Sequence, residues 1–340
     1  MEIERQILEG CDLISLYVCR DVCTRFEGMY WDILRATRDR ILRYFLRAGA
    51  ERFLKILYDA HAVVTGNAAL AFMLRDEGIL GKELDIAVPN GGGTAIENFL
   101  VKTFDAVCLA EYPGALRRRA PYEKLFCIGR RRYVRLIISR QDSALEAVAH
   151  YDTTALMNYF NCDSFGCAFP TLTFRRRALT APWRTLRDRD HIGQFRLIHL
   201  HRAGGFVFCT VPGPLFGGTM AVYRNYGQET LYYRCLRGEN ACPEQGRFFG
   251  DGSSFVSFFH GDDPEAVARV EATGQAPFGP TAKWRLDWCP YWCESRCVRE
   301  ERLIPRGHKT AIFLAEERDI IHGVGFVVRE LLVDPNAVGT

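Results

Sequence analysis

Two short segments carry residues whose types and spacing suit chemistry on a phosphate group. Gly66 and Asn67 lie at a turn that opens an apolar helix, and Glu83 and Asp85 stand two residues apart in a short hydrophobic segment. Side chains alternate along a strand, so both carboxylates should point to one face, roughly 6–7 Å apart. A glycine turn that approaches a phosphate, facing two carboxylates that bind a divalent metal ion, is the minimal set of groups for nucleotidyl transfer.

The apolar pattern predicts the elements that must position these residues. Helical spacing dominates residues 1–58, where no proline interrupts it. A short strand at 62–64 precedes the glycine turn, and a helix from about 68 to 74 follows it. The carboxylates fall on a strand predicted at 84–88 and on the residue before it, and a loop of Pro, Asn and three Gly ends this strand.

The rest of the pattern is mixed. After the carboxylates we predict a helix at 95–104, strands at 125–128 and 133–138, helices at 144–149 and 154–160, and strands at 206–208, 221–223, 255–259 and 326–328. The chain is thereby divided into a helical N-terminal segment (1–58), an α/β domain (59–180) and a β-rich C-terminal region (181–340). In that third region a strand would present His199 and His201 on one face, although no nearby carboxylate completes a metal site.

The composition is that of an ordinary globular protein. Of the 340 residues, 48% are hydrophobic and 25% are charged, which matches a folded chain. Charged residues interrupt every apolar run before it could span a bilayer, and residues 1–5 lack the apolar core of a signal peptide. We therefore expect a cytoplasmic or nuclear protein without a membrane partner, whose 13 cysteines are reduced thiols.

Arginine dominates the positive charge. The net charge is only +3, but six of the 44 basic residues are lysines and the others are arginines. Arginine triplets occur at 117–119, 130–132 and 175–177, all near the glycine turn and the carboxylates in sequence. Such triplets can form an ordinary solvated face, or together a basic patch that contacts phosphate or RNA through the guanidinium fork.

The segments 63–70, 83–89 and 151–159, the last continuing into 167–173, together resemble a family of uncharacterised basidiomycete fungal proteins with a nucleotidyltransferase-like fold. The resemblance covers about residues 50–180. It implies an α/β protein: a nucleotidyltransferase-like mixed sheet with flanking helices, preceded by N-terminal helices and followed by a β-containing C-terminal region. The wider superfamily usually has a glycine-serine pair, an acidic-apolar-acidic triplet, and a third carboxylate on a later strand.

The resemblance also implies roles for individual residues. Gly66 and Asn67 would bind the phosphates of a nucleoside triphosphate, and Glu83 and Asp85 would be the catalytic residues and the ligands of Mg²⁺, with RNA or a protein as the acceptor. The chain departs from the superfamily pattern at three positions. Asn67 stands where Ser is usual, Glu83 stands where Asp is commoner, and Arg135 occupies the expected position of the third carboxylate.

Three hypotheses follow from these residues. The first is a Mg²⁺-dependent nucleotidyltransferase. The second is a catalytically silent relative, a pseudoenzyme that binds a nucleotide or RNA, with Arg135 paired to Glu83 or Asp85 in place of a metal ion. The third is an interaction or adaptor module whose helical N-terminus docks a partner. Independently of these, Glu83 and Asp85 are also consistent with a structural acidic pair that is hydrogen-bonded to loop amides.

Overall fold

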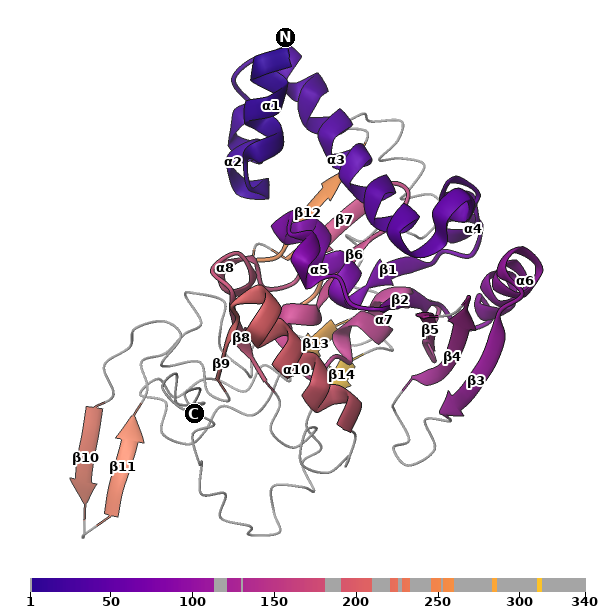
Figure 1. Cartoon of the computed structure of the whole chain (residues 1–340). Helices are drawn as coiled ribbons and strands as arrows, with labels where there is room; N and C mark the ends of the chain where they lie inside the picture. Colours follow the sequence, from indigo (N-terminus) through magenta and orange to yellow (C-terminus); the bar gives the residue numbers. More distant parts are fainter. Residues whose placement is uncertain are drawn as a thin grey trace, which may run out of the picture.

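The computed structural model describes residues 2–112, 121–129, 131–180, 191–209, 221–225, 228–232, 246–251, 253–259, 283–285 and 311–313. Their centre is an eight-stranded mixed sheet with helices packed around it (Figure 1). The predicted α/β class with a mixed sheet and flanking helices is therefore confirmed.

The sheet has the strand order β12-β7-β6-β1-β2-β5-β4-β3. Its strands, in chain order, are β1 (Val63–Thr65), β2 (Glu83–Val88), β3 (Val107–Tyr112), β4 (Tyr122–Ile128), β5 (Arg132–Ile138), β6 (Asn158–Phe160), β7 (Ser164–Cys167) and β12 (Phe255–Phe258). Strands β2 and β5 run parallel, and each other neighbouring pair is antiparallel. The pairing of β12 with β7 brings residues 255–258 into the same sheet as the acidic strand β2.

The helices frame this sheet. They are α1 (Glu2–Gly10), α2 (Leu13–Arg20), α3 (Thr24–Leu46), α4 (Ala50–Asp59), α5 (Gly66–Leu74), α6 (Gly93–Phe104), α7 (Ala144–Ala149), α8 (Pro170–Thr173) and α10 (His191–Gly204), with 3-10 turns η1 (Arg47–Gly49), η2 (Glu77–Ile79) and η4 (Thr154–Leu156). Smaller two-stranded sheets pair β8 (Arg177–Leu179) with β9 (Val207–Cys209), β10 (Ala221–Asn225) with β11 (Gln228–Tyr232), and β13 (Lys283–Arg285) with β14 (Ala311–Phe313).

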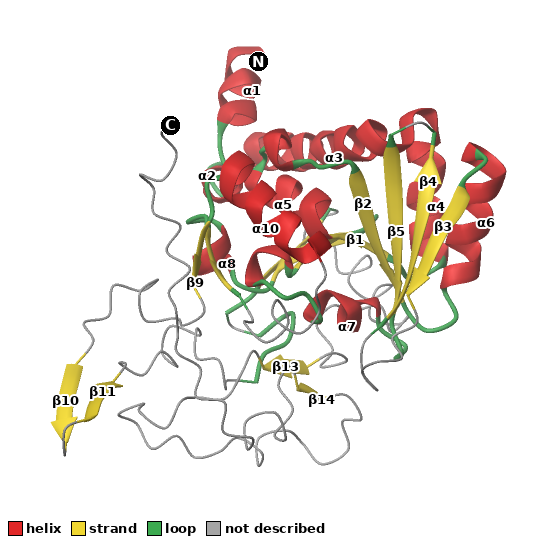
Figure 2. Cartoon of the chain, turned by 60° about the horizontal axis from the view of Figure 1, so that its bottom comes forward, coloured by secondary structure: helices red, strands yellow, loops and turns green. Residues whose placement is uncertain are grey.

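Helices α4 and α6 cover one face of the strands β2, β5, β4 and β3 (Figure 2). The rings of Phe53 and Phe99 stack between these two helices with centroids 5.4 Å apart. Lys124 of β4 points to the same side, because its Nζ lies 3.0 Å from Glu97 Oε2 of α6. The register pairs Asp85 and Leu125 directly with Arg135, so these three side chains lie on the opposite face.

Helix α5 fixes the glycine turn relative to the acidic strand. Its sequence is rich in alanine and leucine, which favour helix, and residues 68–73 are all fully buried. Arg75 ends it in the left-handed conformation, and the Arg75 side chain donates to the carbonyls of Leu8, Glu9 and Cys11. The N-terminal helices are thereby tied to the element that carries the turn.

Two sequence predictions are wrong. Residues 154–160 form the turn η4 and then β6 in place of a helix, because β6 pairs with the distant strand β1 and this long-range pairing overrides a short local pattern. Residues 191–204 form helix α10, so His199 and His201 do not lie on a strand. Gly205 ends α10 with a φ of +63°, as glycine commonly does at a helix end. The strand predicted at 326–328 lies outside the described residues.

The described helices include none that combines the length and the apolar character needed to cross a bilayer. The described cysteines are free thiols; they are Cys11, Cys19, Cys23, Cys108, Cys127, Cys162, Cys167 and Cys209.

Candidate functional site

The glycine turn and the acidic strand meet at Gly66. Strand β1 ends at Thr65, which pairs with Asp85 of β2, and α5 begins at the next residue. Gly66 has a φ of +66°, and a Cβ placed on it would lie 2.1 Å from Asp85 Oδ2 and 3.0 Å from the Tyr151 hydroxyl oxygen. Glycine is required here for both backbone conformation and space, and its absent side chain lets the Asp85 carboxylate lie against the turn.

Arg135 occupies the centre of the acidic face. Its Nε and Nη2 donate to Asp85 Oδ1 and Oδ2 at 3.0 and 2.8 Å, a two-point contact between the guanidinium fork and the carboxylate. Glu83 Oε1 lies 3.3 Å from Arg135 Nε, and Glu123 Oε2 lies 3.4 Å from Arg135 Nη1. One guanidinium is therefore shared by three carboxylates, which come from β2 and β4 on either side of β5.

Tyr151 completes the contacts to Asp85. Its hydroxyl donates to Asp85 Oδ2 at 2.8 Å, and both side chains are buried. Burial, followed by the nearby Asp85 carboxylate, raises the pKa of the Tyr151 phenol well above its ordinary value. The phenol is thus a neutral donor at any physiological pH, and it fixes the position of the carboxylate.

The charge state of Arg135 is equally secure. Burial alone lowers the pKa of this guanidinium, but the carboxylates of Asp85, Glu123 and Glu83 outweigh it and hold the pKa well above its ordinary value. The Arg135 side chain is 13% exposed and that of Asp85 is 3% exposed. A permanent cation therefore lies among the acidic groups, where little water screens it.

These residues do not fit a two-metal site. Both oxygens of Asp85 already accept hydrogen bonds from Arg135, and a fixed guanidinium repels a divalent cation at the same place. Among the described residues, no group of three or more His, Cys, Asp or Glu side chains is arranged to hold a metal ion. The residue set is that of a salt-bridged centre.

The four residues predicted for the site are only partly brought together. Glu83 and Asp85 both contact Arg135, and Gly66 lies against Asp85. Asn67, the second residue of α5, is half-buried beside Gly81, where a Cβ would lie 3.5 Å from Asn67 Nδ2. The buried Oδ1 atom of Asn67 accepts no hydrogen bond from the described residues. This atom is therefore a buried acceptor without a donor among the described residues.

Two residues of the site escaped the sequence analysis. Glu123 lies on β4 two residues before Leu125, the partner of Arg135, and the alternation of a longer predicted strand would have placed it on the acidic face. Tyr151 follows α7 in a loop, and no local pattern connects it with a residue 66 positions earlier. Only the packing of α7 against β2 makes that contact visible.

Comparison with protein-family models, with curated proteins and with solved structures found no match for this chain. The resemblance to the basidiomycete fungal family and the nucleotidyltransferase-like assignment accordingly stay predictions from the three sequence segments.

Proposed function

We propose that this chain is a catalytically silent protein of the nucleotidyltransferase-like class, which binds a nucleotide or RNA without turnover. The observation that carries the proposal is the two-point contact between Arg135 and Asp85. Nucleotidyl transfer by the two-metal route needs carboxylates that are free to coordinate the ions, and here an internal cation holds them. The competing proposal, Mg²⁺-dependent nucleotidyl transfer from a nucleoside triphosphate, requires Arg135 to leave Asp85 first.

Several features still favour a phosphate ligand beside the silent centre. Backbone amides at the start of a helix attract anions, and α5 begins at the glycine turn. Asn67 in the first turn has a side-chain amide next to Gly81, whose lack of a side chain keeps the approach clear. Arg135 compensates the carboxylates that would otherwise repel a phosphate, so an anion is tolerated near this face without a metal ion.

Thermal shift measurements with nucleoside triphosphates test this proposal. We expect ATP, GTP, CTP or UTP to raise the melting temperature by the same amount in Mg²⁺ and in EDTA, because the internal guanidinium takes the place of the ion. A matched variant, Asn67→Leu, should lose that shift while keeping its own melting temperature close to that of the wild type. Stabilisation only with Mg²⁺, or release of pyrophosphate during incubation, would contradict the silent assignment.

A second candidate function, an interaction module, rests on the surface of α1 and α2. Four large aliphatic side chains on these helices and one in the turn after α2 are 42–72% exposed, with a spacing of four residues within each group: Ile3 and Ile7, then Ile14, Val18 and Val22. Helix α1 stands at the N-terminal end of the fold (Figure 1), and α2 packs beside β12, where the rings of Tyr17 and Phe255 lie 5.5 Å apart. Residues 2–22 carry five acids and two arginines, so the apolar stripe has acidic flanks and suits a helix with basic flanks.

Capture from a cell lysate tests this second candidate. We expect a protein that binds the wild-type chain to be lost with Ile7→Glu and Val18→Glu together, and to be released by added salt because the flanks are charged. Val101→Glu is the matched control, since Val101 is a 48% exposed aliphatic residue on α6. Equal capture by the double variant and the control would remove this candidate.

A further inference from the structure

A set of basic residues gathers where β2 and β5 begin and α3 ends. Lys82 directly precedes β2, Arg131 directly precedes β5 and Arg132 begins it, and Arg47 follows the last residue of α3. We call these four residues, Arg47, Lys82, Arg131 and Arg132, the basic end. They come from three segments of the chain that are far apart in sequence.

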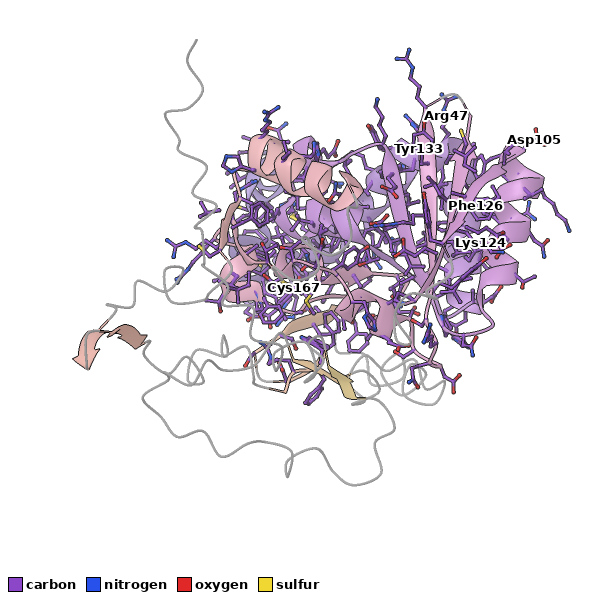
Figure 3. The ribbon with its side chains drawn as sticks, turned by 90° about the horizontal axis from the view of Figure 1, so that it is seen from below. Arg47, Asp105, Lys124, Phe126, Tyr133 and Cys167 are labelled. Carbon is purple, nitrogen blue, oxygen red and sulfur yellow. The ribbon has the colours of Figure 1, made fainter. Side chains whose placement is uncertain are left out.

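Specific contacts hold these segments together. The backbone N–H of Tyr133 donates to the Lys82 carbonyl at 2.9 Å, which places Lys82 beside the start of β5. Arg132 Nη1 donates to the Phe45 carbonyl at 3.3 Å, and its guanidinium lies 4.8 Å from the centre of the Tyr44 ring. Figure 3 shows the labelled residues Arg47 and Tyr133 at the same end of the sheet.

The charges of the basic end lack carboxylate partners in the described part of the chain. Arg47, Lys82 and Arg131 are exposed and take part in no ion pair there, and Arg132 bonds a carbonyl and an aromatic ring. The nearest acid in sequence, Glu83, lies 3.3 Å from Arg135 and belongs to the acidic face. Four uncompensated cations at one end produce a positive potential that attracts a polyanion.

An exposed tyrosine lies among these cations. Tyr44 is 41% exposed and has the Arg132 guanidinium over its ring. Alternation of cations with aromatic rings is the arrangement that binds single-stranded nucleic acid, since phosphates contact the cations while bases stack on the rings. An anionic membrane is less suited, because the large exposed aliphatic side chains lie elsewhere, on the N-terminal helices, α6, β3, α10 and β9.

We propose that the basic end binds single-stranded nucleic acid, with Arg47, Lys82, Arg131 and Arg132 on the phosphates and with Tyr44 against the bases. This surface is separate from the nucleotide site proposed at Gly66 and Asn67, and its binding does not require a ligand there. Lys82 directly follows Gly81, which lies beside the Asn67 side chain. Nucleic acid bound at the basic end therefore passes beside the glycine turn.

Fluorescence anisotropy with labelled oligo-U RNA and oligo-dT DNA of about 20 nucleotides tests the proposal. We expect the logarithm of the association constant to fall linearly with the logarithm of the salt concentration between about 50 and 200 mM. The slope should be about −2 to −3 for three or four phosphate contacts. The RNA and DNA arms show whether the 2′-hydroxyl adds to the affinity.

A triple charge reversal gives the decisive comparison. Arg47→Glu, Lys82→Glu and Arg131→Glu together should weaken binding by about tenfold or more and flatten the salt slope by about 2 units. The matched control reverses three exposed basic residues on other elements, Lys102→Glu, Arg175→Glu and Arg202→Glu, with the same change in net charge. Equal losses in the two triple variants would overturn the proposal, because they would show attraction by net charge alone.

The role of the Tyr44 ring is tested separately. Tyr44→Ala should weaken oligonucleotide binding by about tenfold, with an unchanged affinity for polyphosphate, which has no bases to stack. Equal effects on both ligands would contradict base stacking at this surface. Binding to phosphatidylserine vesicles without binding to either oligonucleotide would instead identify a membrane surface and overturn the proposal. Nucleoside triphosphate shifts measured on the same charge-reversal variant keep a failure here distinct from a failure of the nucleotide site.

Discussion

The acidic face lies along β2, β5 and β4, and the basic end lies where β2 and β5 begin; the charges in the two regions are compensated to different extents. On the acidic face, Glu83, Asp85 and Glu123 surround Arg135 at 2.8 to 3.4 Å, and Tyr151 adds a further hydrogen bond. At the basic end, the exposed side chains Arg47, Lys82 and Arg131 have no ion-pair partner among the described residues. Each set contains four charged side chains.

The two regions differ in how many of their charged groups remain available to a ligand. A buried cation and its carboxylates satisfy one another, so the acidic face has lost the coordination positions that a metal ion would need. Exposed cations keep their hydration and their field, and an anionic ligand can replace that hydration. Charge density alone therefore does not identify a binding site, whereas the presence of internal partners does.

Removal of Arg135 should have the largest effect on stability, because it takes the cation away from the acidic face. Arg135→Met leaves three carboxylates together with no cation, and we expect a loss of about 3–5 kcal/mol in the free energy of unfolding. Urea denaturation measures this loss, and Arg131→Met, an exposed residue on the same strand region, is the control. We also expect Mg²⁺ to stabilise the variant and not the wild type. An unchanged stability would show that Arg135 does not compensate the acidic face.

The glycine turn gives the next largest effect. Gly66→Ala places a methyl group 2.1 Å from Asp85 Oδ2 at a φ of +66°, so Asp85 must move. We expect a loss of about 2–3 kcal/mol. Gly91→Ala separates the two causes, because Gly91 has a φ of +84° and open space around its Cβ position, and should cost about 1 kcal/mol. Equal losses, measured by thermal unfolding, would mean that the contact with Asp85 contributes nothing.

Tyr151 tests the neutral member of the acidic face. Tyr151→Phe removes the hydrogen bond to Asp85 and should lower stability by about 1–2 kcal/mol at neutral pH. Because the folded-state pKa of Tyr151 is raised, the unfolded chain loses this proton first, and wild-type stability should fall as the pH rises above 10. The variant should show a shallower fall in that range. Parallel pH profiles of the two proteins would contradict the proposed protonation state.

The smallest effect is expected at the basic end. Arg131→Gln removes one of several like charges that have no partner in the described chain, and stability should change by less than about 0.5 kcal/mol. Any gain in stability should appear at low ionic strength and disappear at high salt concentration, because the substitution relieves only the repulsion between exposed charges. Melting curves at two salt concentrations measure this. A loss of more than about 1 kcal/mol in the free energy of unfolding would show that Arg131 has an ion-pair partner in the folded chain.

Much of the scaffold around the site could be predicted from local pattern. The prediction gives β2, α6, β5 and α7 nearly the bounds that they have in the fold, because each combines a clear apolar period with a nearby loop signal. The prediction misses the helices α8 and α10 and the strands β3, β6, β7, β8, β11, β13 and β14. Strand β6 has three residues and pairs with β1, so its conformation depends on a partner far away in sequence.

For the site, the sequence by itself determined the glycine turn, because a glycine between two apolar stretches is a local property. The expectation that Arg135 faces the acidic pair came from the resemblance to the nucleotidyltransferase-like superfamily. The tertiary structure decided which charges are compensated. The parallel register of β2 and β5 pairs Asp85 with Arg135, β4 adds Glu123, and the loop after α7 adds Tyr151. It also joined Arg47, Lys82 and Arg131 at one end of the sheet. Long-range register and packing set these distances, and no local pattern contains them.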